Sequence, residues 1–351
     1  MSGINLSKMT VAIATQWNHL LEAFAPYQTD VYYTETYIRL NCFAGQEAFC
    51  LIATEGEQIF LLPFVRNTVQ HEGATYYDFE TAYGYGGAIS NTEDVSFIQS
   101  AWDAAFAHFN ANGYICGFVR FHPLLKNYEH VPNTIRTIYD RHTVAVNLQP
   151  EIDDIWMHQI QTGNRSDILR AGRRGLSFRL ADIEEGINIF RSIYDTTMDR
   201  LHADSFYYFT DAYFADMQKA LPNMCIGIVE YESEPVAAAI FMHNGYYAHY
   251  HLSGSKRELQ RLCPNNFMLW NAVQLMKEQG CRYLHLGGGT DGNEENPLYR
   301  FKQKFSTYRY DFVIGKLVFN PGVYESVCAA WEAANPEKKE TYKRLLLKYH
   351  Y

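Results

Sequence analysis

One order of predicted elements occurs twice in this chain, and that repetition constrains the fold more than any other sequence feature. Extended apolar segments flank Glu55-Gly56-Glu57 and Glu232-Ser233-Glu234, and each pair predicts a β-hairpin. In each half a helix follows, ends at a glycine and leads into a strand, at Asn112-Gly113 and at Gln279-Gly280. The recurrence predicts two copies of one α/β unit, with coincidence among common α/β elements as the alternative.

The boundary between the copies is expected near Pro150, which gives domains at 1–150 and 151–351. With 351 residues, of which 47% are hydrophobic and 20% charged, the chain can bury a core in each domain. The same composition excludes a disordered or low-complexity protein. The pattern also predicts a first helix at Val11–Phe24 and a solvated amphipathic helix at Lys338–Lys348.

Charge and cysteine usage bound the partners and the compartment. The net charge of −9 gives no general attraction for nucleic acid, so no DNA partner is expected. The seven cysteines stand mostly in apolar runs and form no C-x-x-C pair, which indicates reduced thiols without a zinc framework. The first ten residues lack a signal-peptide core, and the longest apolar run, Val236–Met242, is too short to cross a bilayer. We expect a cytoplasmic protein without a membrane span.

Two stretches combine glycine with residues suited to ligand contact. The loop Thr81–Gly87 places three glycines among Tyr83 and Tyr85, so a ligand could approach the backbone closely; a tight turn is the alternative. Leu286–Gly289 has a glycine-rich strand end, and the basic-aromatic segment Leu298–Phe305 follows it. A lysine there could stabilise an oxyanion or a phosphate, and a lysine lying on the surface is the alternative.

Two further stretches are rich in arginine or in histidine. Four arginines of the segment 164–175 crowd one side of a predicted helix, which suits phosphate or carboxylate; a solvated helix face is the alternative. His249 and His251 share one face of a strand, and His285 stands on a later strand. No acidic or thiol residue has matching spacing, so ordinary hydrogen-bonded histidines are expected and no metal.

In this order, the tyrosine-glycine loop, the arginine helix, the strand His249–Ser255 and the Leu286–Phe305 ending resemble the FemAB-like branch of the GNAT acyltransferase superfamily. The resemblance covers about residues 30–315. It implies two GNAT-like domains in tandem, each a mixed, mainly antiparallel sheet flanked by helices, with the acyl-transfer site in the second. It also implies transfer of an amino acid from aminoacyl-tRNA to a peptidoglycan-precursor peptide, or of an acyl group from another donor.

The resemblance carries over site residues only where the motif matches. Phe301 and Lys302 match the family's Phe-Lys pair, whose lysine binds or polarises the acyl ester. Residues that would contact substrate are Tyr83, Tyr85, Gly86, Arg200, Tyr208, Tyr250 and Gly288. Residues that would contact donor phosphates or RNA are Arg165, Arg170, Arg173, Arg174, Lys256 and Arg257. The general base is unassigned, and the candidates beside the glycine-rich loops are Asp78, Glu80 and Asp291.

Two departures bear on the donor. Residues Glu184–Gln218 are predicted to form short helices broken at Asp204–Phe209 and not the long helical hairpin of the bridge-forming members, which weakens the case for tRNA. The stretch Lys256–Asn266 has no glycine and contains Pro264, so the usual coenzyme A phosphate cradle is missing.

Three classes of function therefore stay open: an aminoacyltransferase that uses tRNA, an N-acyltransferase that uses a coenzyme A or carrier thioester, and a binding protein without catalysis. We expect direct transfer to the amine of a small-molecule or peptidoglycan-precursor acceptor, with the acyl donor as co-substrate and no permanently bound cofactor.

Overall fold

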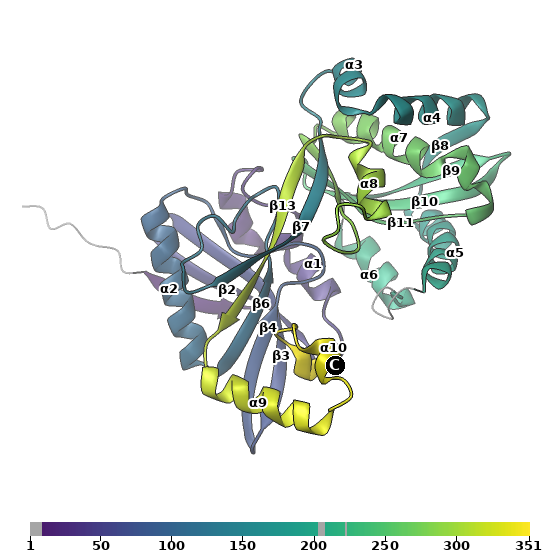
Figure 1. Ribbon diagram of the computed structural model, residues 1–351. Helices are drawn as coiled ribbons and strands as arrows, with labels where there is room; N and C mark the ends of the chain where they lie inside the picture. Colours follow the sequence, from purple (N-terminus) through teal and green to yellow (C-terminus); the bar gives the residue numbers. More distant parts are fainter. Residues whose placement is uncertain (1–8, 203–207, 222) are drawn as a thin grey trace, which may run out of the picture. The chain divides into compact units, whose positions relative to one another are not determined.

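The computed structural model describes residues 9–202, 208–221 and 223–351, and Figure 1 shows the path of the chain. Contacts between residues divide it into two units, 1–140 with 311–351 and 141–310. This division differs from the expected 1–150 and 151–351, because the last forty or so residues return to the first unit. Two strands cross the boundary along the chain: β7 (Arg136–Asn147) leaves unit 1, and β13 (Arg309–Val318) returns to it.

The sheet of unit 1 is antiparallel except for one parallel pair, β4 and β6. Its strand order is β1-β2-β3-β4-β6-β13, and the short β5 (Ile89–Ser90) pairs with β3. The predicted hairpin around Gly56 is formed by β2 and β3. The remaining strands run over Thr10–Ala14 (β1), Glu47–Glu55 (β2), Gln58–His71 (β3), Ala74–Glu80 (β4) and Tyr114–Arg120 (β6).

Two apolar clusters cover the two faces of this sheet. Tyr114 packs in the cluster under α2 (Val95–Ala111), and its neighbour Ile115 packs in the cluster under α9 (Pro321–Ala334), since successive strand residues face opposite sides. Asp94 begins α2 by accepting hydrogen bonds from the Ser96 and Phe97 amides. The other helical segments are η1 (Asn18–Ala23), η2 (Val31–Tyr33), α1 (Glu35–Leu40), α10 (Lys339–Tyr342) and η6 (Lys348–His350).

Two local predictions in unit 1 were wrong, and tertiary contacts explain both. The expected helix Val11–Phe24 begins instead as β1, because Thr10–Ala14 pairs with the edge of β2. The expected solvated helix at Lys338–Lys348 is α-helical only over Lys339–Tyr342, and the segment is not fully solvated. Leu346 and Leu347 are buried against Ile115 and Val327, so the C-terminal segment completes the core of unit 1.

The sheet of unit 2 has the order β7-β12-β11-β10-β9-β8, again with one parallel pair, β11 and β12. Helices α4 and α7 cover one face and α5 the other (Figure 1). On β10, Phe241 packs in the cluster under α7 and Ile240 is buried on the opposite side. The strands are β8 (Leu176–Ala181), β9 (Met224–Tyr231), β10 (Glu234–His243), β11 (Tyr247–Ser255) and β12 (Tyr283–Gly288).

The helices of unit 2 match the expected short elements. The predicted interruption at Asp204–Phe209 falls largely on 203–207, outside the described residues, between α5 and α6. The helical segments are α3 (Ile152–Asp154), the π-helix η3 (Ile155–Gln159), α4 (Thr162–Arg173), α5 (Ile183–Leu201), α6 (Asp211–Ala220), η5 (Arg257–Leu262), α7 (Pro264–Glu278) and α8 (Pro297–Gln303).

The two units repeat one topology, as the sequence predicted. Each has a strand, a helix and a strand whose two strands pair in parallel: β4–α2–β6 in unit 1 and β11–α7–β12 in unit 2. The predicted fold class, duplicated mixed sheets that are mainly antiparallel and flanked by helices, is confirmed. In the described part of the chain no helix has both the length and the apolar character needed to cross a membrane.

Candidate functional site

The parallel strands β11 and β12 of unit 2 separate after three residue pairs. Their pairing runs from Tyr247 opposite Tyr283 to His249 opposite His285. Beyond that point β11 continues to Ser255 beside β10, and β12 continues to Gly288 beside β7. From Tyr250 to Ser255, therefore, β11 has β10 on one side and is not paired with β12 on the other.

A bulge in each strand accounts for the separation. The register of β11 against β10 shifts between the pairs Ile240–Leu252 and Phe241–Tyr250, so His251 is the extra residue. The register of β12 against β7 shifts between His285 and Gly287, which has a φ of +77°. A bulge bends its strand, and both bulges directly follow the last parallel pair.

The imidazole of His251 is neutral at physiological pH. Burial is the main cause and the charge of His249 the smaller one, and together they lower the pKa of His251 to about 3.

Helix α8 places Lys302 at the end of β12. The buried side chain of Asn296 begins the helix by accepting hydrogen bonds from the Leu298 and Tyr299 amides. Lys302 is only 8% exposed, and its Nζ donates a 2.8 Å hydrogen bond to the Gly288 carbonyl, the last residue of β12. An ammonium group has three donors, so this contact uses one of them.

Burial and, to a smaller extent, the nearby positive charge of Arg141 together lower the pKa of Lys302 to about 7. Arg141 donates a 2.8 Å hydrogen bond from Nη1 to the Gly289 carbonyl, so two cations bind successive carbonyl groups after β12. Sequence reasoning missed Arg141. The available signal was its place at the start of a predicted strand, beside His142.

Neighbouring atoms approach the backbone at the end of β12 so closely that only glycine fits there. A Cβ on Gly288 would lie 2.8 Å from the His142 carbonyl oxygen, and one on Gly289 would lie 2.7 Å from the side chain of Asn296. Phe301 is half-buried, with its ring 5.6 Å from that of Phe305, and packs against the core of unit 2. It therefore anchors α8.

Three other predicted substrate-contact residues lie in unit 2. Tyr250, on β11 just after the last parallel pair, is half-buried, and burial raises its pKa to about 12. Arg200, in the last turn of α5, donates a 3.2 Å hydrogen bond to the Ser255 carbonyl at the end of β11. Tyr208 is 40% exposed and donates to Asp199 at 2.9 Å.

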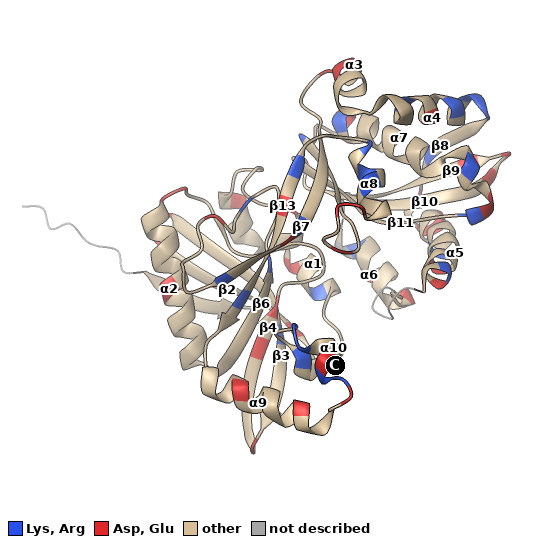
Figure 2. Ribbon diagram, viewed as in Figure 1, with Lys and Arg blue, Asp and Glu red and all other residues tan. Residues whose placement is uncertain are grey.

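The predicted basic residues differ in their contacts, and two of them, Arg170 and Arg174, contact the segment directly before α7. Arg165 binds the carbonyls of Trp156, Met157 and Ile160, so it closes the π-helix η3. Arg170 pairs with Asp167 and reaches to 3.9 Å from the Cys263 sulfur, directly before α7. Arg174 donates to the Arg261 carbonyl of η5, and Arg173 and Arg257 are exposed. Figure 2 shows the basic segment of α4.

The first turn of α7 directs its own polar side chains inward. Cys263 has a left-handed φ of +60°, and Pro264 follows it as the first helical residue. Asn265 donates to the Ser255 hydroxyl at 3.1 Å, and Asn266 donates to the Asn164 side chain at 2.7 Å. The structure therefore puts side chains and a proline ring where a glycine-rich phosphate loop would present backbone amides.

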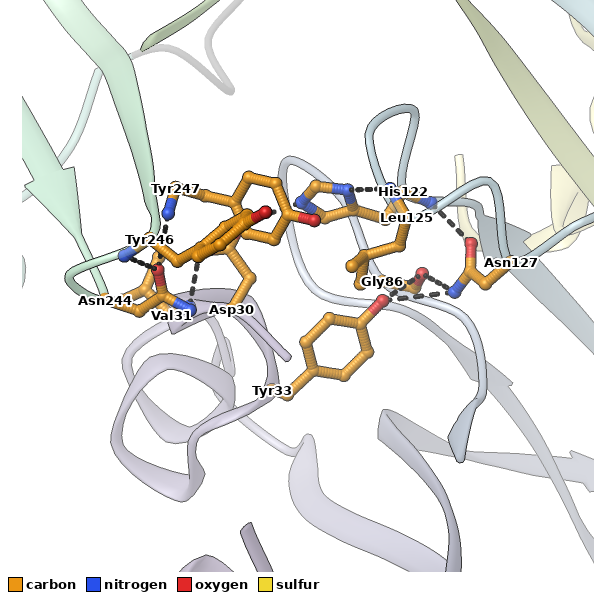
Figure 3. Close-up of polar contacts among 10 residues, drawn as sticks. All are labelled: Asp30, Val31, Tyr33, Gly86, His122, Leu125, Asn127, Asn244, Tyr246 and Tyr247. Atoms are coloured by element: carbon orange, nitrogen blue, oxygen red, sulfur yellow. Dashed lines mark hydrogen bonds and ion pairs between the residues drawn. The ribbon is translucent and has the colours of Figure 1, made fainter. Parts of the chain in front are cut away.

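In unit 1 the tyrosine-glycine loop is held by hydrogen bonds to its carbonyl groups. The Gly86 carbonyl accepts from the Tyr33 hydroxyl and from Asn127 Nδ2, each at 2.8 Å (Figure 3). The Tyr83 carbonyl accepts from Tyr37 at 2.7 Å. The half-exposed Tyr85 has its ring 5.7 Å from that of His122. The loop therefore has a fixed backbone with two half-exposed tyrosine rings.

The three candidate bases have structural partners. The buried carboxylate of Asp78 accepts hydrogen bonds from Asn67, Tyr349 and His350 at 2.7–2.8 Å. Glu80 pairs with Arg120 at 2.9 Å. Asp291 is exposed and accepts from the Asn293 amide at 2.9 Å. Within the described residues, none of the three has a position that favours it as the base.

Comparison with known proteins finds a family model that matches part of the chain. Residues 163–303 match the family model of the acetyltransferase (GNAT) domain. That segment contains β11, α7, β12 and α8. No curated protein sequence is similar enough to the chain to match.

Three solved structures share the fold over most of the chain. FemX aligns with a TM-score of 0.68 and 14% identity, over 91% of this chain and 99% of its own. The L-PGS structure from Bacillus licheniformis gives a TM-score of 0.51 at 15% identity, over 86% and 91% of the two chains. The C-terminal domain of a protein from Agrobacterium fabrum assigned as a lysylphosphatidylglycerol synthetase gives 0.53 at 13%, over 84% and 89%. At these identities the similarity establishes the fold.

Residues 163–303 of the chain therefore carry an acetyltransferase (GNAT) domain. The fold of the chain is that of the FemAB-like branch, which the sequence resemblance had indicated.

Proposed function

We propose that the protein transfers an aminoacyl or acyl group to an amine of a cell-wall precursor, or of a related amino-sugar or peptide acceptor, at the end of β12 in unit 2. One observation carries the proposal: the buried amine of Lys302 lies where β12 ends, beyond the point at which β11 and β12 separate. A strand edge that is free of its neighbour can bind an extended donor through backbone groups. The fold of FemX supports the choice of acceptor class.

In the proposed reaction, the neutral acceptor amine attacks the donor carbonyl. A new C–N bond forms, the ester C–O or thioester C–S bond breaks, and the proton lost by the amine ends on the departing oxygen or sulfur. Lys302 in its charged form stabilises the negative charge that develops on the carbonyl oxygen. One such donor contributes about 3 kcal/mol of barrier lowering. The Gly288 carbonyl orients the ammonium group for this contact.

The cysteine thiols support direct transfer without a covalent intermediate. Burial raises the pKa of Cys42 to about 11 and that of Cys225 to about 12. Burial also raises the pKa of Cys50 and Cys116 well above the ordinary thiol value. A thiol that stays protonated at neutral pH is a poor nucleophile.

The proposed donor binds along β11 with its phosphates near α7. The basic set of α4 and η5 (Arg170, Arg173, Arg174, Lys256, Arg257) supplies positive charge for them. The side chains of Asn265 and Asn266 and the ring of Pro264 favour a donor that does not require a glycine-rich cradle, such as aminoacyl-tRNA. Coenzyme A-dependent acetylation of a small amine is the second candidate, and the acetyltransferase domain match at 163–303 favours it.

Each unit, taken by itself, has candidates for contact with an acceptor. In unit 2, Tyr250 follows the last parallel pair of β11, and Arg200 and Tyr208 lie on α5 and just beyond it. In unit 1, the loop with Tyr83, Tyr85 and Gly86 offers two half-exposed rings on a fixed backbone. Tyrosine suits a polar ligand because it offers a flat face and a hydroxyl group.

The test is an acyl-transfer assay with two donors, acetyl-CoA and charged tRNA, and a peptidoglycan-precursor peptide that bears a free lysine amine as acceptor. We expect amide product by mass spectrometry with one donor, and a loss of at least 100-fold in turnover in Lys302→Ala. Lys219→Ala, at an exposed lysine on α6, is the matched control and should keep wild-type turnover. Undiminished turnover in Lys302→Ala would remove this residue from the reaction, and absence of product with both donors would refute the proposed acceptor class.

A further inference from the structure

The buried side chain of Asn164 joins three helices of unit 2. It stands in the first turn of α4 and is 2% exposed. Its Oδ1 accepts a 2.7 Å hydrogen bond from Asn266 in the first turn of α7. Its Nδ2 donates a 3.1 Å hydrogen bond to the carbonyl of Lys304, the residue that ends α8. Both functional atoms of one amide therefore contact different elements.

The start of α4 supports the same end of α8 through a second residue. The Gln161 amide donates to the Lys304 carbonyl at 2.9 Å, and the Gln161 side chain donates to the Gln303 carbonyl at 3.3 Å. The last carbonyl groups of a helix have no partner inside it. The positive start of α4 provides those partners and also meets the negative end of α8.

This arrangement sets α8 relative to α7. Lys304 is two residues beyond Lys302, so a hydrogen bond that holds the Lys304 carbonyl also limits movement of the turn that carries the lysine. Asn266 belongs to the helix start near which the basic set lies. The two hydrogen bonds of Asn164 therefore connect the end of α8 to the start of α7.

The hydrogen bonds of Asn164 with Asn266 and Lys304 are made by a buried side chain, so the loss of one of them has a specific cost. A buried amide that loses a partner leaves an unsatisfied donor or acceptor, whereas an exposed one would exchange it for water. Removal of the Asn164 side chain would take this partner from the buried Asn266 side-chain amide and would leave the Lys304 carbonyl with the Gln161 amide alone. The end of α8 would then be held by Gln161 only and would lose its connection to α7, so water could reach these groups.

We propose that Asn164 is a positioning residue of the acyl-transfer site, which fixes Lys302 on α8 relative to the start of α7, where the phosphates of the donor would bind. The inference rests on the proposed function of Lys302, and it adds a residue that contacts neither substrate. The sequence pattern of 164–175 favoured the arginines as functional residues. The structure shows that Asn164, at the beginning of this segment, contacts α7 and the end of α8.

The experiment follows the titration of Lys302 in the protein without donor or acceptor, by NMR of ¹³C,¹⁵N-lysine-labelled samples. The Lys302 signal is assigned by its loss in Lys302→Arg. In the wild type we expect a midpoint of about 7, set by burial and by Arg141. In Asn164→Ala we expect the midpoint to rise by at least one pH unit, because water reaches the amine when α8 loses its anchor.

The matched control is Asn271→Ala, since the Asn271 amide donates only to Phe267 within α7. It should leave the Lys302 midpoint at the wild-type value. If Asn164→Ala does not fold, Asn164→Ser keeps one polar contact, and a smaller rise in the midpoint is expected. A folded Asn164 variant with the wild-type midpoint would overturn the proposal. The NMR titration of Lys302 does not depend on turnover. A wild-type midpoint in the Asn164 variant can therefore be distinguished from a negative result in the Lys302→Ala assay.

Discussion

The parallel strand pairs of the two units hold the same place in their sheets and end differently. In unit 1, β4 and β6 remain paired as far as Glu80 opposite Phe118, and a bridge between Gly86 and Phe121 continues the contact. The Arg120 guanidinium ties them further, with bonds to the Thr81 carbonyl and to Glu80. In unit 2, β11 and β12 separate after His249 and His285.

The position of the bulges explains the difference. In unit 2 the bulges at His251 and next to Gly287 follow the last parallel pair and bend both strands there. In unit 1 the irregularity in the β4–β6 pairing comes near the start, between Tyr77 and Asp78, and the strands then stay together. One topology thus gives a closed pair and an open pair, and the open pair has the buried lysine at its end.

The closed pair should be the more sensitive to added volume. A Cβ on Gly117 of β6 would lie 2.4 Å from the fully buried ring of Phe79, so Gly117→Ala should lower the free energy of unfolding by about 3 kcal/mol. Gly163→Ala, with open space around its Cβ, is the control and should be neutral or slightly stabilising in urea unfolding. Equal stabilities of the two variants would contradict a tightly packed pair in unit 1.

The amine of Lys302 on α8 is buried at the end of the open strand pair, and burial of its charge destabilises the fold. Lys302→Met should therefore raise the free energy of unfolding at pH 7 by about 2 kcal/mol. Because the folded pKa of Lys302, about 7, lies below its unfolded value, the unfolded chain binds more protons between the two values. Wild-type stability should rise with pH across that window, and the Met variant should lack this part of the rise. The measurement is the free energy of unfolding against pH for the wild type, Lys302→Met and the exposed control Lys219→Met. If stability still rose with pH to the same extent in Lys302→Met, the lowered pKa of Lys302 would be contradicted.

The bend in β12 should matter for turnover more than for stability. Gly287 has a φ of +77°, so Gly287→Ala should cost about 1 kcal/mol of stability and reduce turnover by at least tenfold as the strand end shifts. Gly280→Ala has a similar left-handed φ of +81° outside the site, and it should show the stability cost alone. If both variants kept full turnover, the bend would have no part in catalysis.

The basic set should affect polyanion binding with little effect on stability. Arg173 is exposed, so Arg173→Ala should change stability by less than about 0.5 kcal/mol. Its loss should lower the salt dependence of tRNA binding, the slope of log K against log salt, by about 1. Arg282→Ala, at an exposed arginine elsewhere in unit 2, should leave the slope unchanged, and fluorescence titrations at several salt concentrations measure both.

Local sequence signals predicted most of the fold because hairpin turns, helix ends and strand periodicity act over short distances. The hairpins at Gly56 and Glu232-Ser233 and the strands after Gly113 and Gly280 formed as expected. The helix expected at Val11–Phe24 did not form at its start because the short apolar run Val11–Ala14 also suits an edge strand, and pairing with β2 stabilises the strand. Strands β8 and β13 were not predicted.

The candidate site was predictable only where one residue carries a chemical signal. Lys302 could be named because it follows a glycine-rich strand and matches the Phe-Lys pair of the family that the sequence resembles, and the structure places it in a buried position at the end of that strand. The roles of Arg141 and Asn164 were not predicted, because the groups that they contact lie more than a hundred residues away in the sequence; the position of Arg141 beside a predicted strand was a weak signal.

The most direct test of this account is hydrogen–deuterium exchange of the whole protein with and without each donor, acetyl-CoA or charged tRNA. The account predicts that one donor slows exchange at Tyr250–Ser255 of β11 and at the start of α7, and leaves β4 and β6 unchanged. Protection confined to β4 and β6, or no protection in unit 2 with either donor, would contradict the assignment of the open strand pair as the transfer site.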